Sequence, residues 1–495
     1  MRYSLGIDCG TQSSKAIIID AMNGLVLASS SSPHTMYTNE SGAREQDPSI
    51  WIAAIKQSIT DVIEKANIDP QKIQSIGVSG QQHGLVVLDE NDKVIRKAKL
   101  WCDTETVAEN DQFITSIGGA EGAFQHLGLS IEPGYTVSKI LWLKVHEPEH
   151  YKKIRKILLP HDYINYWLTG NHCCEYGDAS GTGLFNIDTR QWSEYACNKI
   201  DESGFLKDKL PKVVAPFDPI GLVKSQICDL FGFSDNVVVS VGGGDNMMGA
   251  IGTGNIENGI VTLSLGTSGT IYTHSSDYIN FKSPSIANFC SSTDGWLPLI
   301  CTMNVTSATT SVLNCLNQDI SDFSSALSNT TIGASGINVY PFFNGERVPS
   351  LPKAQASISG LTSDNFTTNN LIRATVEGIT YVLKLGADIL LNSGVEFNQI
   401  RVIGGGANSK EWRQIVADIF DTEVVTLKNE EAAALGAAIQ SSWLIFPNID
   451  RAEIVSKFVI IDDDNTVKPS MMNVELYKNE LEKFALGLEK SYVTK

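Results

Sequence analysis

Residues 3–20 read YSLGIDCGTQSSKAIIID, and this stretch gives the first indication of the fold. Tyr3–Ile7 and Lys15–Ile19 are apolar, β-prone runs, and the residues between them include a turn at positions 8–11. Asn23-Gly24 is a hairpin dipeptide that leads into a third run, Leu25–Ala28. We therefore predict that the chain begins with a meander of three antiparallel strands.

A second stretch of the same kind follows about half the chain length later. Ile260–Leu265 is predicted as a strand, Gly266–Gly269 as a turn built again from Gly, Thr and Ser, and Thr270–Thr273 as the return strand. The Gly-rich stretch Gly249–Asn258 lacks a strong periodicity and separates the two. We interpret the chain as two related halves, each opening with a hairpin.

The chain of 495 residues is long enough for two or three domains at roughly 150 residues per domain. We predict an N-terminal domain at residues 1–250, a C-terminal domain at residues 258–445, and an extension at residues 446–495 that packs on the second domain. The extension contains an amphipathic helix, Val474–Leu488, whose partner is either this chain or a second copy in a homodimer.

Helices alternate with strands in both halves, which indicates an α/β fold class. Asp47 is predicted to cap a helix that has Pro48 at its first position. Gln74–Val78 is predicted to be a short strand. A long helix is predicted at Leu371–Asn392. Asn408 and Glu411 have capping-box spacing for a further helix. Another helix is predicted to start at residues 429–431.

Composition excludes several classes of function. A net charge of −18 repels polyphosphate backbones, so we expect no nucleic-acid partner. We also expect no membrane partner, because no apolar run approaches the 18 or so residues that a membrane helix needs. The nine cysteines are scattered without a Cys-x-x-Cys motif, which fits a reducing cytoplasm better than an exported, disulfide-bonded protein.

The first turn carries the groups that phosphate binding needs. The backbone N–H groups of a tight hairpin form an anion-binding concavity. Thr11, Ser13 and Ser14 add hydroxyl donors, Lys15 adds a positive charge, and Asp8 can hold a metal-bound water. The same residue types are common in turns, so an ordinary hairpin is the alternative.

The second turn repeats this chemistry with Gly266, Thr267 and Ser268. Two such turns can clamp one polyphosphate, so the repeat favours phosphate binding over two unrelated hairpins.

Three glycines, at residues 242–244, precede Asp245 and Asn246 after a predicted strand. Glycine lets the backbone approach a ligand closely, and open α/β sheets bind ligands at the carboxyl ends of their strands. A carboxylate at this edge can accept a proton from an attacking hydroxyl. The alternative is a turn in which Asp245 caps the following helix.

A second glycine triplet, at residues 404–406, leads to Asn408. Gly405 and Gly406 permit a flat ligand, such as a nucleotide base, to lie on the backbone. A simple strand-to-helix loop is the alternative here.

Two further loops offer polar and aromatic groups suited to a sugar. Gln82 and His83 lie in a loop at the end of a strand, and Trp101 with Asp103 offers an aromatic wall and a carboxylate. Each has a structural alternative, since a lone His is more often structural than catalytic. The acidic run at residues 462–464 lacks calcium-loop spacing and is predicted to be a solvated turn.

Taken in order, these motifs resemble the FGGY family of carbohydrate kinases. Residues 8–15 are similar to its first phosphate loop and residues 265–269 to its second, residues 79–84 to a sugar loop, and residues 242–246 to the loop with the catalytic Asp. Residues 344–349, NGERVP, match a family signature at four of six positions, and residues 404–414 resemble the adenosine motif. Cys102, Glu105 and Asn344 depart from the family pattern.

The resemblance implies an actin-like ATPase fold, with two related ribonuclease-H-like domains around a central cleft. It implies ATP and Mg²⁺ as cofactors, with Asp245 as catalytic base and Asp8 holding Mg²⁺ through water. The nucleotide would be bound by Thr11, Ser13, Ser14, Lys15, Gly266, Thr267, Ser268, Gly405, Gly406 and Asn408. The sugar would be bound by Gln82, His83, Trp101, Asp103, Asp245 and Asn246.

We therefore expect ATP-dependent phosphorylation of a ketopentose, with the terminal hydroxyl of D-xylulose as the first candidate acceptor. Ribulose, L-xylulose, a polyol and gluconate are alternative acceptors. A nucleotide-gated assembly protein with the same fold, or an inactive regulatory relative, is an alternative of a different class.

Overall fold

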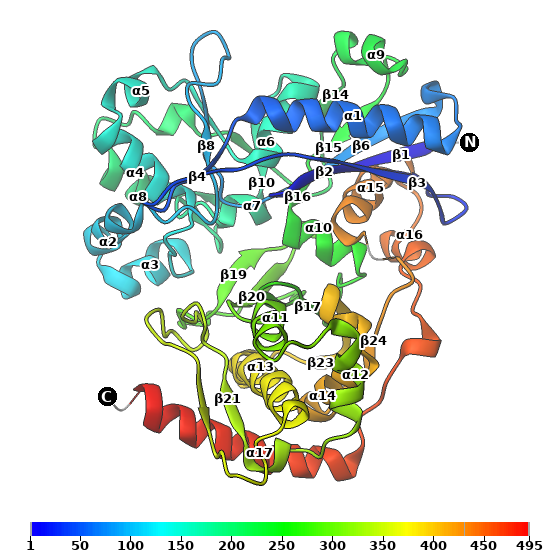
Figure 1. Ribbon diagram of the computed structural model, residues 1–495. Coiled ribbons are helices and arrows are strands. Elements are labelled where there is room, and N and C mark those ends of the chain that lie inside the picture. The colour runs from blue at the N-terminus through cyan, green and yellow to red at the C-terminus, as the bar shows by residue number, and fades with distance from the viewer. Residues whose placement is uncertain (1, 430, 494–495) are drawn as a thin grey trace. The chain divides into compact units, whose positions relative to one another are not determined.

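A computed structural model describes residues 2–429 and 431–493. The chain forms two compact units, and neither is continuous in sequence. Unit 1 comprises residues 1–256, 275–297 and 431–459, and unit 2 comprises residues 257–274, 298–430 and 460–495. Figure 1 shows the chain path and the labels of its elements.

The central sheet of unit 1 has the strand order β14-β15-β6-β1-β2-β3, with β16 also pairing with β6. Its strands are β1 (Tyr3–Cys9), β2 (Ser13–Asp20), β3 (Leu25–Pro33), β6 (Ile73–Gly80), β14 (Pro219–Leu222), β15 (Val238–Ser240) and β16 (Gly243–Gly244). The first three strands form the predicted antiparallel meander, whereas β6 runs parallel to β1, β15 and β16.

Helix α1 (Pro48–Ala66) covers one face of this sheet. Asp47 caps it as predicted, because its side chain accepts a hydrogen bond from the backbone N–H of Ser49 at 2.9 Å. Trp51 and Ile55 of α1 are completely buried in one core with Leu5 and Ile7 of β1.

Helix α15 (Ala432–Ile445) packs on the opposite face, as Figure 1 shows in orange below the sheet. Gly6 of β1 and Gly77 of β6 make this packing possible. A Cβ atom added at Gly6 would overlap the carbonyl oxygen of Ala434, and one added at Gly77 would overlap that of Ala437. The two glycines therefore allow the helix backbone to lie directly on the strands.

Smaller elements complete unit 1. Short strands pair as β4 (Tyr37–Thr38), β5 (Arg44–Gln46) and β8 (Ala98–Lys99); β7 (Val86–Leu88) and β9 (Lys156–Leu158); β10 (Cys173–Glu175) and β13 (Lys212–Val214); and β11 (Phe185–Asn186) and β12 (Gln191–Trp192). Strand β19 (Ala287–Cys290) also belongs to unit 1. Its other helices are α2 (Val107–Ser116), α3 (Gly119–Leu127), α4 (Thr136–His146), α5 (Pro148–Lys153), α6 (Pro160–Thr169), α7 (Tyr176–Ser180), α8 (Glu194–Ile200), α9 (Ser225–Phe231), α10 (Asp245–Gly252) and α16 (Arg451–Phe458).

Unit 2 repeats the arrangement of a sheet with a hairpin at its centre. Its main strands are β17 (Gly259–Leu265), β18 (Gly269–Thr273), β20 (Trp296–Thr302), β23 (Phe397–Ile403) and β24 (Val424–Val425), with β21 (Asn338–Tyr340) and β22 (Ser357–Ser359) in a separate pair. β17 and β18 form the predicted hairpin, and β23 runs parallel to β17.

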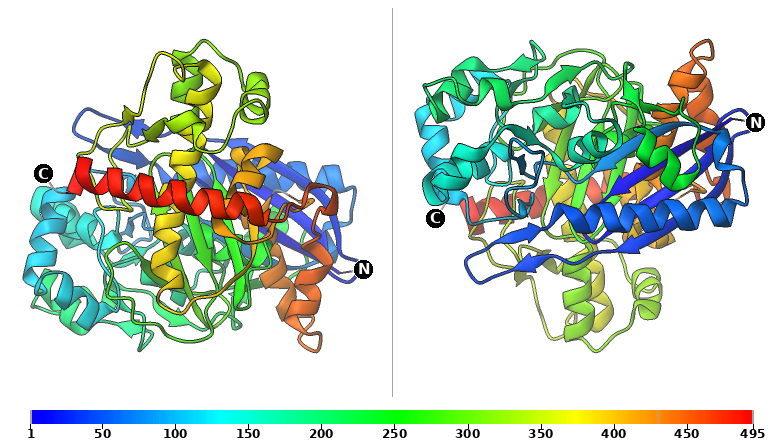
Figure 2. Two further views of the ribbon diagram at one scale, coloured as in Figure 1. Left: turned by 90° about the horizontal axis from the view of Figure 1, so that it is seen from below. Right: turned by 90° about the horizontal axis from the view of Figure 1, so that it is seen from above.

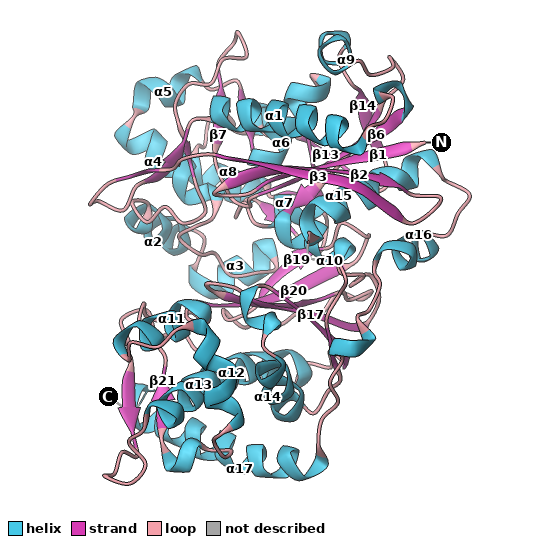
Figure 3. Cartoon of the chain, turned by 45° about the vertical axis from the view of Figure 1, so that its right-hand side comes forward, coloured by secondary structure: helices cyan, strands magenta, loops and turns pink. Residues whose placement is uncertain are grey.

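The helices of unit 2 are α11 (Thr306–Cys315), α12 (Ile320–Ser328), α13 (Thr368–Leu391), α14 (Lys410–Phe420) and α17 (Met471–Leu488). Figure 3 shows α12, α13 and α14 grouped on one side of the strands. The predicted C-terminal helix is α17, which packs on α13 and α14 and is drawn in red in Figure 2. The Tyr477 hydroxyl contacts Glu377 of α13 at 3.0 Å inside the protein.

Two sequence predictions need correction. The N-cap of α14 is Ser409, because its hydroxyl and not the Asn408 side chain accepts the N–H of Trp412. Helix α15 begins at Ala432, later than the predicted start, and Glu430 lies outside the described residues. The predicted domain boundaries stay a prediction; the compact units are a different division of the chain, in which residues 275–297 and 431–459 belong to unit 1.

The described helices include none that is both long enough and apolar enough to cross a membrane.

We predict that Gly77→Ala destabilises unit 1 by about 3 kcal/mol, because the new methyl group has to displace the backbone of α15. Gly10→Ala is the matched control at the end of the same sheet, where the nearest atom to an added Cβ lies 3.4 Å away. Urea unfolding of both variants measures the difference. Equal midpoints for the two variants would contradict the packing described for α15.

Candidate functional site

Three parallel strands of unit 1 end side by side and place two carboxylates at one edge of the sheet. Asp8 of β1 is in register with Ser79 of β6, and Ser79 is in register with Gly243 of β16. The Ser79 hydroxyl donates to Asp8 Oδ1 at 2.8 Å. Asp245 follows β16 directly and is the first residue of α10. The predicted pair of acidic residues therefore lies at the carboxyl ends of β1 and β16, the two strands that flank the end of β6.

Both carboxyl groups have raised pKa values. Burial raises the pKa of Asp8, and a hydrogen bond from Ser79 and the charge of Lys15 partly offset this effect. Burial, with the negative charges of Asp8 and Asp178, raises the pKa of Asp245 from 3.8 to about 7. Both side chains keep some exposure to solvent. A carboxylate with a pKa near neutrality is suited to accept a proton from a bound hydroxyl.

The first hairpin turn presents only part of its predicted phosphate-binding set. The Lys15 side chain is partly exposed and forms an ion pair with Glu431 at 2.6 Å. The Thr11 hydroxyl donates to Gln81 at 3.3 Å and accepts from Trp101 Nε1 at 3.1 Å. Ser13 is partly exposed at the start of β2.

Ser14 is placed differently from the sequence prediction. Its side chain is completely buried, because residues alternate between the two faces of β2 and Ser14 faces the side that α1 covers. Its carbonyl accepts a hydrogen bond from Ser58 of α1 at 3.0 Å. The prediction that the Ser14 hydroxyl contacts a ligand at this turn is therefore not supported by its position.

The loop after β6 contains Gln82 and His83, and it holds Gln82 against the start of α10. Gln82 is buried, and its Oε1 accepts a hydrogen bond from Asn246 Nδ2 at 2.8 Å. His83 has a φ of 64°, in the left-handed region that non-glycine residues rarely adopt. Its ring packs against Tyr135, with the ring centroids 4.6 Å apart, and against Phe289 at 5.8 Å. The backbone strain at His83 fits a functional position.

Trp101 and Asp103 have different surroundings. Trp101 reaches the hairpin turn through its bond to Thr11. Asp103 is only 1% exposed, and its carboxylate accepts hydrogen bonds from the backbone N–H groups of Arg44 (2.9 Å) and Glu105 (3.1 Å) and from Lys99 Nζ (3.1 Å). The Asp103 carboxylate is thus bonded to groups of the protein itself, whereas the sequence predicted that it contacts a sugar directly.

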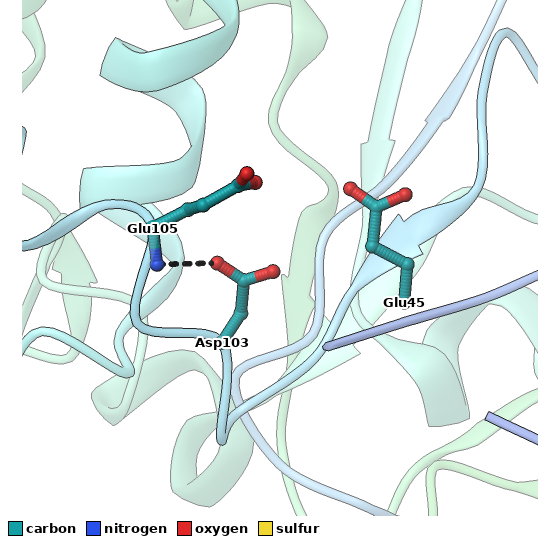
Figure 4. A group of neighbouring side chains, drawn as sticks. All are labelled: Glu45, Asp103 and Glu105. Carbon is teal, nitrogen blue, oxygen red and sulfur yellow. Dashed lines mark hydrogen bonds between the residues drawn. The ribbon is translucent and has the colours of Figure 1, made fainter. Parts of the chain in front are cut away.

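Figure 4 shows Asp103 beside Glu45 and Glu105, whose carboxylates come close together. The ammonium group of Lys99 contacts all three, at 3.3 Å from Glu45 and 2.5 Å from Glu105. The lysine supplies the positive charge that this acidic cluster requires.

Sequence reasoning missed two glutamines that connect these loops. Gln81 Nε2 donates to Gln46 Oε1 at 3.0 Å, and Gln46 Nε2 donates to the Thr11 carbonyl at 2.7 Å. The indole of Trp51 also donates to Gln46 Oε1 at 2.8 Å. Gln81 could have been noted from its place in the loop after β6, but the sequence near Gln46 gives no comparable signal.

In unit 2, two glycine segments lie side by side at the carboxyl ends of β17 and β23. Gly404 has a φ of 88°, and a Cβ added there would lie 2.9 Å from the carbonyl oxygen of Leu265. Gly405 faces open space, since no atom lies within 4 Å of an added Cβ. The Gly266 and Thr267 carbonyls are fixed by backbone N–H groups at the start of α11. An exposed backbone surface of this kind can receive a flat ring and a phosphate.

Comparisons with known proteins agree on one family. The family model described as the FGGY family of carbohydrate kinases, N-terminal domain, matches residues 3–252, and the model of the C-terminal domain matches residues 261–445. The chain is similar to a xylulose kinase of Haemophilus influenzae, with 46% identity over 99% of this chain and 100% of that protein.

Solved structures extend the similarity to three dimensions. A ligand-bound xylulose kinase from Lactobacillus acidophilus has a TM-score of 0.92 and 25% identity, and a gluconate kinase from the same organism has a TM-score of 0.91 and 25% identity. Each comparison covers 99% of both chains.

We predict that Asp245→Asn raises the stability of the protein at pH 8 by about 1–2 kcal/mol, allowing for the partial exposure of the side chain. The native pKa of Asp245 lies above its unfolded value, so the native state binds more protons than the unfolded state between pH 4 and 7. Stability is therefore lost as pH rises through this window, and a neutral amide removes the loss. Thermal unfolding at pH 8 and pH 5 measures the effect, and the gain should be smaller at pH 5. An equal or larger gain at pH 5 would contradict the raised pKa.

Proposed function

Because the chain belongs to the FGGY family of carbohydrate kinases, we propose that it transfers the γ-phosphoryl group of ATP to the terminal hydroxyl of D-xylulose, giving D-xylulose 5-phosphate. The family resemblance and the actin-like ATPase fold class predicted from the sequence are both confirmed. The observation that carries the proposed mechanism is the position of Asp245 beside Asp8, with a pKa raised to about 7.

Asp245 acts as the general base in this proposal. It accepts the proton of the sugar hydroxyl as the hydroxyl oxygen forms a bond to the γ-phosphorus. The bond between that phosphorus and the β–γ bridging oxygen breaks, and ADP leaves with the electron pair. Phosphoryl transfer relies mainly on positioning and on electrostatic stabilisation of the transferring group. One well-placed base is therefore the only group of the protein that has to take part in proton transfer.

Asp8 fits the role of holding Mg²⁺ through water. Its Oδ1 accepts from Ser79, which fixes the carboxylate at the edge of the sheet, and the side chain is partly exposed there. When bound, Mg²⁺ neutralises phosphate charge. Asp8 would hold the ion through a water molecule, and the hydrogen bond from Ser79 keeps its carboxylate from turning away.

The remaining ligand-binding roles follow the geometry of each unit. In unit 1, Lys15 and the backbone of residues 10–13 are proposed to contact phosphate, and Lys15 exchanges its ion pair with Glu431 for that contact. In unit 2, the proposed nucleotide-binding segments are residues 266–268 and 404–408, where Gly405 leaves the backbone open to the base. Thr11 supports the turn through its two hydrogen bonds.

Gln82, His83 and Asn246 are proposed to bind the sugar hydroxyls, with Trp101 as an aromatic wall. Asp103 supports the Trp101 loop from within through its bonds to Lys99 and the backbone. A buried polar site of this kind rejects analogues that leave its groups unpaired.

Gluconate is the second candidate acceptor, because the gluconate kinase of L. acidophilus is as similar in fold and identity as the xylulose kinase of that organism. We propose a cytoplasmic location, since all nine cysteines are free of disulfide bonds and eight of them, all but Cys315, are buried or half-buried. A homodimer through α17 stays a proposal: Met471, Met472 and Leu476 are exposed on that helix.

We predict that D-xylulose stimulates ADP release from Mg-ATP by at least tenfold over L-xylulose, D-ribulose, L-ribulose, glycerol and gluconate, as ranked by kcat/KM. A coupled assay with each sugar, and with none, measures it. A higher kcat/KM for gluconate would identify gluconate as the acceptor and would leave the proposed mechanism unchanged. Turnover that is independent of every sugar would favour a nucleotide-gated assembly protein.

We also predict that Asp245→Asn lowers kcat by at least about a thousandfold while leaving the Kd of Mg-ATP within about threefold, because the amide keeps the shape of the side chain but accepts no proton. Steady-state kinetics and nucleotide calorimetry measure the two quantities. Turnover close to that of the wild type would remove Asp245 from the role of base.

A further inference from the structure

Residues 344–349, NGERVP, resemble a family signature, and the proposed mechanism gives them no role. Within this segment the Glu346 side chain is only 2% exposed, whereas Asn344 and Arg347 are exposed. Burying a carboxylate is costly unless other groups compensate for its charge, so the surroundings of Glu346 require an explanation.

Both carboxylate oxygens of Glu346 accept hydrogen bonds from N–H groups. Oε1 accepts from the backbone N–H of Met303 at 2.6 Å and from that of Arg347 at 2.8 Å. Oε2 accepts from Asn304 Nδ2 at 3.0 Å. Burial raises the pKa of Glu346, and these hydrogen bonds partly offset the effect because they stabilise the ionised carboxylate. All three bonds need an acceptor, which an ionised carboxylate provides at both oxygens.

Asn304 extends this contact to the rest of the segment. It is 2% exposed, its Nδ2 also donates to the Gly345 carbonyl at 2.7 Å, and its Oδ1 accepts from the backbone N–H of Asn344 at 3.1 Å. Glu346 in turn exchanges two backbone hydrogen bonds with Leu351, each 2.9 Å long. The segment is therefore closed on itself on one side and bonded on the other to the residues just before α11.

The two residues that Glu346 contacts outside its own segment connect β20 to α11, which begins at Thr306 (Figure 1). The backbone N–H of Thr306 donates to the Gly266 carbonyl at 2.9 Å. The Thr267 carbonyl accepts the backbone N–H of Ser307 at 3.3 Å and the Ser307 hydroxyl at 2.9 Å. The second glycine turn is therefore bonded to the start of α11, which directly follows the residues that Glu346 holds.

These bonds set the direction of the N–H groups in the turn. A trans peptide is planar, and its C=O and N–H groups point in opposite directions. The Gly266 carbonyl shares its peptide with the N–H of Thr267, and the Thr267 carbonyl shares its peptide with the N–H of Ser268. Because both carbonyls are bonded to the start of α11, both N–H groups point away from α11.

We infer that Glu346 is a positioning residue for the nucleotide: through Met303 and Asn304 it holds the start of α11, and α11 directs the N–H groups of residues 267 and 268 toward the phosphates. This inference rests on the proposed function, because it takes residues 266–268 as a phosphate-binding segment. It adds a role for the segment at residues 344–349.

The test is Glu346→Gln, which keeps the shape of the side chain but replaces one acceptor oxygen by an NH₂ group. Whichever way the new amide lies, its NH₂ group faces either Asn304 Nδ2 or the N–H groups of Met303 and Arg347, so at least one bond is lost. We expect the Kd of Mg-ATP, measured by calorimetry, to rise by at least about tenfold, and the KM for ATP to rise with it.

The KM for D-xylulose should stay within about twofold of the wild type, because Glu346 has no contact with the proposed sugar loops. A loss of folded protein alone would lower the number of nucleotide-binding sites and leave the Kd of the remaining sites unchanged.

Asp418→Asn is the matched control. Asp418 lies in the same unit, is also 2% exposed, and accepts the backbone N–H of Ser470 at 2.8 Å and the side-chain amides of Asn473 and Gln414 at 2.9 Å. These partners lie on α14 and at the start of α17, away from the glycine turn. The Kd of Mg-ATP for D418N is expected to stay within about threefold of the wild type. A Kd for E346Q no higher than that for D418N would overturn the inference.

A second pair of variants tests the bond between α11 and the turn without changing a buried carboxylate. Ser307→Ala removes the hydroxyl that donates to the Thr267 carbonyl, and we expect the Kd of Mg-ATP to rise about threefold. Ser311→Ala is its control, because the Ser311 hydroxyl donates to the Ser307 carbonyl at 2.9 Å, one turn further along the same helix. Equal Kd values for S307A and S311A would overturn the inference.

Should E346Q fail to fold, Glu346→Asp replaces it, because a carboxylate on a side chain one methylene shorter cannot reach Met303 and Asn304 together. The same rise in Kd is expected, and an unchanged Kd in E346D would overturn the inference. If neither variant folds, the S307A and S311A pair decides.

Nucleotide binding and turnover separate this inference from the proposed function. Wild-type protein that binds Mg-ATP but shows no sugar-stimulated ADP release would overturn the proposed function, and the Kd values of the variants would still decide the inference. An active wild type with equal Kd values in E346Q and its control would overturn the inference alone.

Discussion

Strand β6 pairs in parallel with β1 on one side and with β16 on the other, and the rest of the site depends on this pairing. Parallel strands bring their carboxyl ends to one edge of a sheet. Asp8, Ser79 and Gly243 therefore lie in one row, and Asp245 begins a helix one residue beyond β16. Residues 8, 79 and 245 thus become neighbours through strand pairing, and no long loop is needed to bring them together.

In this sheet the helix backbone of α15 also has to lie directly on the backbone of the strands. Gly6 and Gly77 leave room for α15, which comes from residues 432–445, to pack against the sheet formed by the start of the chain. Gly436 of α15 makes an equally close approach to Met248 of α10, the helix that Asp245 opens. The position of Asp245 is thus fixed from both ends, by a strand before it and by close helix packing after it. The raised pKa of Asp245 costs stability once the pH exceeds the unfolded-state pKa of the group.

Much of the fold could be predicted from the sequence because its signals are local. The hairpin at residues 3–20, the Asp47 cap and the long helix α13 each follow from periodicity or from a capping residue within a few positions. The site was harder to predict, because its contacts join distant segments. The burial of Ser14 depends on α1, and the occupation of the Asp103 carboxylate depends on Lys99 and Arg44. Neither can be inferred from residue type alone.

In the proposed mechanism, Asp245 takes the proton from the acceptor hydroxyl. A crystal structure of the wild-type protein with D-xylulose, Mg²⁺ and a non-hydrolysable ATP analogue tests it most directly. In this complex we expect an Asp245 carboxylate oxygen about 3 Å from the terminal hydroxyl of the sugar, with Gln82 and Asn246 on the neighbouring hydroxyls. A sugar bound with its terminal hydroxyl beyond the reach of Asp245, and in contact with another base, would contradict it.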